Sequence, residues 1–136
     1  MKIPDPRLQL PTQEQWEEAV SQGFSPDGSS NSTDTIFGVR IGRTSTDYLP
    51  GLPANLHDFR YWCGGGPGGQ FMADTEHYWQ LRYKCDGEFR GWKAPLRWLA
   101  RIRIRARYRA LRELGYIAWD GHRDAGHTGP NPILRD

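Results

Sequence analysis

The chain has 136 residues, 37% of them hydrophobic, and a mean hydropathy of −0.77, so it can form one compact domain with a small core. Its net charge of +2 and its two cysteines exclude a strongly charged protein and a disulfide framework. The sequence has no apolar run that could cross a bilayer and no apolar signal core at its amino terminus. We therefore expect a protein that stays in a cytoplasm or is packaged in a virion assembled there, neither secreted by a signal peptide nor transmembrane.

The first third of the chain predicts one short helix and one strand. Residues 1–11 are interrupted by prolines and predict an extended arm. Thr12 and Gln15 form a capping-box pattern, which predicts a helix that ends near Gly23. A polar loop rich in turn-forming residues follows. Residues 35–42 then predict a β-strand, because they are β-branched and aromatic.

Two helices, at roughly 54–63 and 71–85, are expected next. Five glycines and one proline in residues 64–70 exclude a helix through the joint, so the two helices predict an antiparallel hairpin. In that hairpin Cys63 and Cys85 would lie roughly 20 Å apart, which is beyond disulfide reach. We therefore expect two free thiols.

A long basic helix is expected to begin at Pro95 and to end before Gly115. Residues 101–110 alternate strictly, which is typical of a strand, but the segments on both sides favour a helix. The fold class predicted from these elements is mainly α (α+β), with a small β element before the helical hairpin. We expect a single domain over residues 1–119 and a polar tail over residues 120–136.

On a helical wheel the long helix has an arginine side and an apolar side. Residues 97–113 hold seven arginines and one acid, a net charge of +6, which leaves −4 for the rest of the chain against the total of +2. Four interpretations stay open: a solvated face paired with the chain's own acids, an acidic or assembly protein partner, a nucleic-acid backbone, or an anionic lipid surface. The partner-binding candidates on the arginine side are Arg97, Arg101, Arg105, Arg109 and Arg112, and the apolar side carries Trp98, Leu99, Ile102, Ala106 and Ala110.

The stretch "LHDFRYW" places His57 and Asp58 next to each other on the first helix of the hairpin. Neighbouring side chains on a helix point about 100° apart, whereas residues three or four apart share a face. His57 and Tyr61 are therefore expected to face one partner, and Asp58 another. The second helix offers Asp74 or His77 as the partner of His57. Such a partner would fix the tautomer of the imidazole, as a general base requires.

The segment "HDFRY", followed by "AD" and an aromatic residue four positions later, resembles the phospholipase A2 superfamily. The core of that superfamily is an antiparallel pair of helices that carries H-D-x-x-Y and a later aspartate. Small phage proteins of unknown function carry a similar pattern. The resemblance covers about residues 38–85 and implies a calcium-dependent esterase that acts on lipid.

The resemblance also implies a role for each residue of the motif. His57 would be the general base that activates a water, and Asp74 would orient it. Tyr61 would hydrogen-bond Asp74. Asp58 would bind Ca2+, which would polarise the ester carbonyl and stabilise the oxyanion. The remaining metal ligands would be backbone carbonyls of "GVRIG", namely those of Gly38 and Gly42.

Two functions from different classes therefore remain open. The first is a small phage-type structural or interaction protein that uses the hairpin as a scaffold and docks through its arginine-rich helix onto a protein of an assembly. The second is a calcium-dependent phospholipase A2-like esterase. An enzyme needs His57 and Asp58 exposed in a cleft, whereas a scaffold would bury His57 against Asp74.

Overall fold

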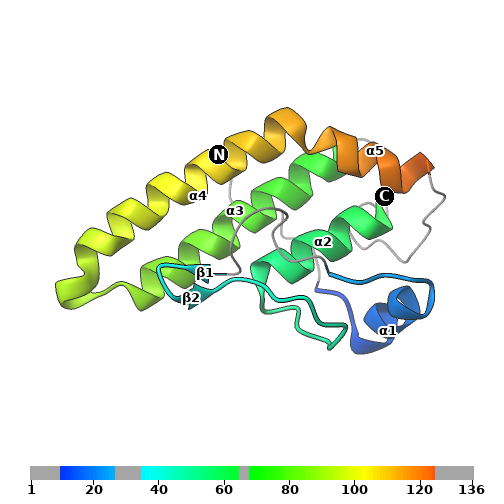
Figure 1. The fold of residues 1–136 in the computed structure, drawn as a ribbon, viewed down its shortest axis with the longest axis horizontal. Helices are drawn as coiled ribbons and strands as arrows, with labels where there is room; N and C mark the ends of the chain where they lie inside the picture. The colour runs from blue at the N-terminus through cyan, green and yellow to red at the C-terminus, as the bar shows by residue number, and fades with distance from the viewer. Residues whose placement is uncertain (1–9, 27–34, 65–67, 125–136) are drawn as a thin grey trace.

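The computed structural model describes residues 10–26, 35–64 and 68–124, and expectations for the rest of the arm, the loop, the joint and the tail lie outside these ranges. The described chain is mainly helical with one small β-hairpin before the helical hairpin, as the sequence predicts (Figure 1). In chain order the elements are α1 (Gln13–Ser21), β1 (Thr35–Ile36), β2 (Val39–Arg40), α2 (Pro53–Cys63), α3 (Gly69–Glu88), the short 3₁₀ helix η1 (Gly91–Lys93), α4 (Ala94–Leu114) and α5 (Tyr116–Asp124).

Three helices lie side by side along the long axis of the molecule (Figure 1). Helix α3 is in the middle and contacts both α2 and α4. Consecutive helices reverse direction, so α2 and α3 form the predicted hairpin and α4 returns along α3. The β-hairpin packs on α3, and α5 packs on α2. Helix α2 is therefore covered from several directions.

Helix α1 begins where the capping box predicts. The backbone N–H of Gln15 donates to Thr12 Oγ1 (3.1 Å), and the N–H of Thr12 donates to Gln15 Oε1 (2.9 Å). These two bonds satisfy amide groups that the first turn of a helix leaves without partners. Trp16, on the inner side of α1, stacks on Phe59 of α2 with ring centroids 5.3 Å apart. The capping box thus starts a helix whose function in the fold is to cover α2.

The prediction of one strand over residues 35–42 is wrong in form, because the segment folds back on itself. Its two short strands pair antiparallel, with Ile36 opposite Val39. Phe37 and Gly38 form the turn between them, with φ angles of 48° and 85°. Glycine adopts such a left-handed angle without a steric cost, so Gly38 favours a turn in the middle of the predicted strand.

Helix α2 is almost entirely buried. It begins with Pro53, a residue suited to the first helical turn, and all of its residues except Asp58 are buried. Helix α3 continues to Glu88, about one turn past its predicted end at Cys85. The two cysteines are free, as expected from their positions at the ends of the hairpin, and both are buried.

Helix α4 is a helix and not a strand, but it faces the core with a side that was not expected. The predicted apolar side is wrong: Trp98, Leu99 and Ile102 are exposed. Ile102 and Ile104 lie about 200° apart on a helix, so only one of them can face inward. The side that packs on α3 and the β-hairpin consists of Leu96, Ala100, Ile104 and Tyr108.

The predicted boundary between domain and tail at residue 119 falls inside α5, which runs from Tyr116 to Asp124. Trp119 is buried and meets the ring of Tyr61 edge to face, with centroids 5.2 Å apart. This contact fixes the beginning of α5 on α2. Among the described residues, no helix has the length and the apolar character needed to cross a membrane.

Candidate functional site

The hairpin carries a polar network centred on the carboxylate of Asp74. His57 Nε2 lies 2.8 Å and the hydroxyl of Tyr61 lies 2.7 Å from Asp74 Oδ1. A guanidinium nitrogen of Arg112 donates to Oδ2 of the same residue (2.8 Å). Asp74 is fully buried and accepts from both α2 and α4. Three donors compensate the burial of one carboxylate, so the network stabilises the joining of three helices.

His77, one turn after Asp74 on α3, stands next to His57, with ring centroids 4.6 Å apart. Its Nδ1 lies 3.1 Å from the carbonyl oxygen of Pro53, and its Nε2 accepts from Nε of Arg107 (2.9 Å). These partners require the neutral tautomer that carries its proton on Nδ1. Burial holds the pKa of His77 well below 6.5, and the electrostatic effects of His57 and Arg107 lower it further. His77 is therefore a neutral structural residue at pH 7.

The geometry around His57 orients its ring but leaves the ring almost inaccessible to solvent. Because a carboxylate only accepts, the contact with Asp74 places a proton on Nε2 of His57 and leaves Nδ1 as the nitrogen that would act as a base. His57 is only 7% exposed. Burial and the charge of Asp74 also raise the pKa of Tyr61 strongly, so Tyr61 remains a donor. The arrangement can hold an imidazole in one orientation, but it does not present that imidazole in an open cleft.

Asp58, the residue proposed to bind Ca2+, occupies the only incompletely buried position of α2. It is close enough to Arg107 to act on it: burial lowers the pKa of Arg107, and the charge of Asp58 opposes that effect. A guanidinium thus supplies positive charge beside the carboxylate. Within the ranges that the structure describes, no cluster of three or more His, Cys, Asp or Glu side chains is placed to hold a metal ion.

The two glycines proposed as metal ligands lie at different places. A Cβ atom added to Gly42 would lie 2.6 Å from Cβ of Ala54, so Gly42 allows the chain after β2 to approach the start of α2. Two hydrogen bonds fix this approach: the N–H of Ala54 donates to the carbonyl of Ile41 (2.7 Å), and the N–H of Arg43 donates to Oδ1 of Asn55 (2.9 Å).

Gly38, in contrast, lies in the turn of the β-hairpin, beside the last residues of α3. Those residues are about three helical turns, or roughly 17 Å, along α3 from His77, which stands beside His57. The structure therefore brings His57, Tyr61 and Asp74 together, but it does not bring Gly38 to Asp58.

A second buried ion pair was not found from the sequence. Arg60 of α2 binds Glu76 of α3 through two hydrogen bonds of 3.0 Å each. Both side chains are buried. The spacing could have identified the pair, because Arg60 follows His57 by three positions and Glu76 follows Asp74 by two. Two charged residues on facing helices fix the relative position of the helices, because shifting one helix would leave both charges unpaired.

The five arginines of the predicted binding side do not act together. Arg101 binds Asp86 through two hydrogen bonds (2.8 and 3.0 Å), and Arg112 binds Asp74. Arg97 is half-buried. Arg105 and Arg109 are exposed, and neither forms an ion pair within the described part of the chain. Of the five, only these two are exposed without an ion pair to another described residue.

Two features remain as candidates for function: the network around Asp74, and the exposed side of α4. Comparison of the chain with protein-family models, with curated proteins and with solved structures finds no match. The proposals below depend on the chemistry of the residues themselves.

Proposed function

We propose that this chain is a small interaction protein of phage structural type, which docks onto a protein partner through the exposed side of α4. The observation that carries this proposal is the exposure of large apolar residues between arginines on that side. Trp98 is 66%, Ile102 49% and Leu99 42% exposed. We name this surface the outer face of α4 and define it by Trp98, Leu99, Ile102, Arg105 and Arg109.

The spacing of these residues makes one continuous surface. Trp98, Ile102, Arg105 and Arg109 follow one another at intervals of three or four residues, so they form one stripe along the helix. Tryptophan and arginine contribute most often to the affinity of protein interfaces, because they bury large areas and form directed hydrogen bonds. The fitting partner is a protein surface with an apolar centre and acidic groups at its edge.

The buried network supports this interpretation of the hairpin. His57 is buried against Asp74, the arrangement expected of a scaffold, and Arg112 of α4 closes it. Helix α4 is thereby held rigidly on α3, also through Arg101 and Asp86. A rigid helix loses little conformational freedom on binding, which favours affinity. The phage-type assignment itself depends on the resemblance of the His57 motif to small phage proteins.

The test is photo-crosslinking in the cell that makes the protein. A photoreactive residue at position 98 should yield one crosslinked protein, and the same residue at position 92 should not. Trp92 is a matched control, because it is an exposed tryptophan outside α4. The purified pair should then bind with an affinity that Trp98→Ala lowers at least tenfold and Trp92→Ala leaves unchanged.

Two results would contradict the docking proposal. One is a crosslinking pattern that is the same at positions 98 and 92. The other is binding to DNA or to anionic lipid vesicles that falls steeply between 50 and 300 mM salt, since phosphate contacts release counterions. In that case the outer face of α4 would bind phosphate and not protein.

A hydrolase is the second candidate, favoured by one specific observation. Asp74 contacts both His57 Nε2 and the hydroxyl of Tyr61, which is the arrangement that the resemblance to phospholipase A2 implies for an oriented base. The test is calorimetric titration with Ca2+ of wild type and of Asp58→Asn, together with hydrolysis of a short-chain phospholipid. Binding that is lost in the variant, with activity lost in His57→Asn, would favour the hydrolase. No heat of binding in wild type would exclude it.

A further inference from the structure

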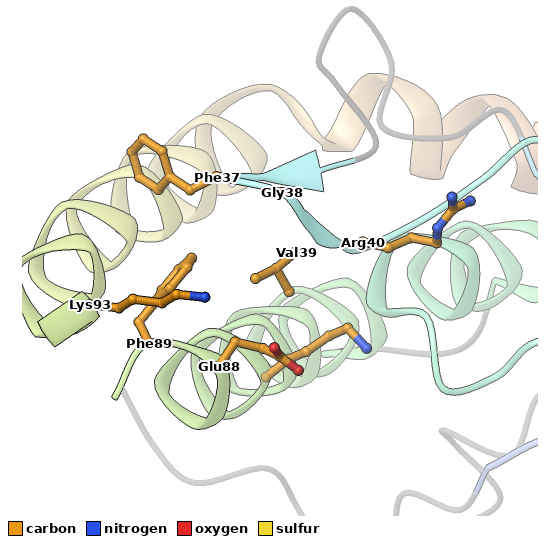
Figure 2. Close-up of a pocket in the computed structure, with 8 residues that line it drawn as sticks. Phe37, Gly38, Val39, Arg40, Glu88, Phe89 and Lys93 are labelled. Carbon is orange, nitrogen blue, oxygen red and sulfur yellow. The ribbon is translucent and has the colours of Figure 1, made fainter. Parts of the chain in front are cut away.

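A pocket of about 460 Å³ lies at the end of the molecule that the network does not occupy (Figure 2). It is bounded by the turn of the β-hairpin, by the last residues of α3 and by η1. Sites for small molecules typically have volumes of this order. The pocket is about three helical turns along α3 from His77, so it is separate from the network around Asp74. None of its lining residues belongs to the outer face of α4.

One wall of the pocket is apolar. It consists of Phe37, Val39 and Phe89, of which Val39 and Phe89 are buried. Figure 2 shows Val39 descending into the pocket from β2, with Phe89 on the side near η1. The rings of Phe37 and Phe89 meet edge to face, with centroids 6.3 Å apart. A flat apolar group can pack against such a wall.

The remaining side chains give the pocket a positive charge. Arg40, Lys84 and Lys93 line it together with one acid, Glu88, which makes a net charge of +2. In the described segments none of these four residues forms an ion pair, although Lys93 also lies 5.4 Å from the ring centroid of Trp92. Three cations and a single acid around a hollow leave a net positive charge that attracts a small anion.

The backbone at Phe37 gives an independent reason to expect a ligand. Phe37 has a φ of 48°, a left-handed angle that is unfavourable for a bulky residue. Asparagine before a glycine is the common choice for a turn with two positive φ angles. Phe37 remains 41% exposed, so burial does not explain its presence there. The guanidinium of Arg103 lies 5.1 Å from the centroid of its ring, which holds the ring in place at the pocket.

We propose that this pocket binds a small aromatic anion: a flat ring system that bears one carboxylate or phosphate. The ring system packs on Phe37, Val39 and Phe89, and the anionic group binds Lys84, Lys93 or Arg40. The single acid, Glu88, weakens the binding of the anion. This site is independent of the docking surface on α4, and the proposal does not depend on it.

Isothermal titration calorimetry tests the site with defined probes. 1-Naphthyl phosphate and 1-naphthoate carry the same ring and different anionic groups, so their relative affinities identify the preferred group. Inorganic phosphate has the charge without the ring, and 1-naphthylmethanol has the ring without the charge. Each of these two controls should bind at least tenfold more weakly than the tighter naphthyl anion.

Variants then locate the site. The double change Lys84→Met and Lys93→Met should weaken the tighter probe at least tenfold, whereas Arg90→Met, which removes an exposed cation that does not line the pocket, should change affinity less than twofold. Glu88→Gln should strengthen binding severalfold. Phe37→Asn should weaken binding at least tenfold, because it removes the ring. It should leave the melting temperature equal or higher, because asparagine adopts the positive φ angle of this turn at a lower cost than phenylalanine.

Phe37→Asn is expected to lower the affinity without lowering the melting temperature. A variant with an unchanged or higher melting temperature has not lost affinity by unfolding. The proposal is overturned if neither naphthyl anion binds, or if inorganic phosphate binds as tightly as 1-naphthyl phosphate. It is equally overturned if Phe37→Asn and the double lysine variant bind the probe as wild type does.

Discussion

His77 shows how a single buried residue makes stability depend on pH. Its pKa lies well below 6.5 in the folded chain, because the site is buried and faces His57 and Arg107, whereas the unfolded chain titrates near 6.5. Below that pH His77 binds a proton in the unfolded state but stays neutral in the folded state. The stability associated with His77 is therefore complete above pH 6.5 and is lost as the pH falls below it.

We predict that the free energy of unfolding of wild type falls between pH 7 and pH 5, and that His77→Gln falls less steeply. The difference in slope should approach about 1.4 kcal/mol per pH unit at most, the value for one proton. Urea denaturation at several pH values measures it. Equal slopes would show that folding does not lower the pKa of His77.

Gly115 is required where α4 ends and α5 begins. A Cβ atom there would meet the carbonyl oxygen of Leu111 and would lie 2.5 Å from the hydroxyl of Tyr61, inside the network of Asp74. We predict that Gly115→Ala lowers the free energy of unfolding by roughly 1–3 kcal/mol, the range for overpacking. Thermal or urea denaturation measures the effect.

Gly87 in α3 is the matched control, because a Cβ atom there meets nothing within 4 Å. Gly87→Ala should raise stability by about 0.5–1 kcal/mol, since alanine favours a helix. If both variants changed stability in the same direction, the contact between Gly115 and Tyr61 would not be important for packing.

At the scale of the element, α4 is attached to α3 by ion pairs of unequal strength. Arg101 and Asp86 meet at the surface, where solvent and the loss of side-chain freedom cancel most of the gain. Arg112 meets Asp74, which is fully buried and depends on its donors. The same kind of pair therefore has different consequences at the two ends of one helix.

We predict that Arg101→Met changes the free energy of unfolding by less than about 1 kcal/mol. Arg112→Met should lower it by roughly 1.5–3 kcal/mol, the range for a lost hydrogen bond to a charged group. Urea denaturation of the two variants under the same conditions provides the comparison. An Arg101 variant as unstable as the Arg112 variant would show that the surface pair is the stronger attachment.

At the scale of the whole molecule, the two thiols report whether the core is closed. Burial raises the pKa of Cys63 to about 12 and that of Cys85 to about 11, and each residue is buried at an end of the hairpin. Thiolate is the reactive form, so the folded protein should contain almost none of it at pH 8.

We predict that 5,5′-dithiobis(2-nitrobenzoic acid) labels the folded chain at least a hundredfold more slowly than the unfolded chain. In 6 M guanidinium chloride both cysteines should react, giving two thiols per chain, as the sequence contains. Absorbance at 412 nm measures the reaction. Rapid labelling of one thiol in the native protein would show that one end of the hairpin opens.

The elements of this fold are predictable where local chemistry sets them. The capping residue Thr12, the glycine-rich joint and Gly115 determine where helices start and end within a few residues. Local signals do not predict which side of α4 faces inward, since the alternation of arginine and isoleucine allows either Ile102 or Ile104 to do so. Packing against α3 makes that choice.

The candidate site is predictable only in part, for the same reason. Helical spacing leaves Asp74 or His77 as the partner of His57, and only the resemblance of the motif implies that His57, Tyr61 and Asp74 meet. The partners from α4, Arg107 and Arg112, lie 30 residues or more along the chain from His77 and Asp74. No local pattern connects such residues. The arginines of α4 that complete the network are therefore seen only once the helices are packed together.

Helix α2 has one further consequence, for how the molecule opens. Nearly all of its residues are covered, by α1, by α3, by α5 and by the chain around Gly42. Its amide hydrogens can exchange with solvent only when these coverings separate together. The slowest hydrogen exchange in α2 should thus equal the rate set by unfolding of the entire chain. Exchange in α2 then measures global stability, and the exchange of every other element can be compared with it.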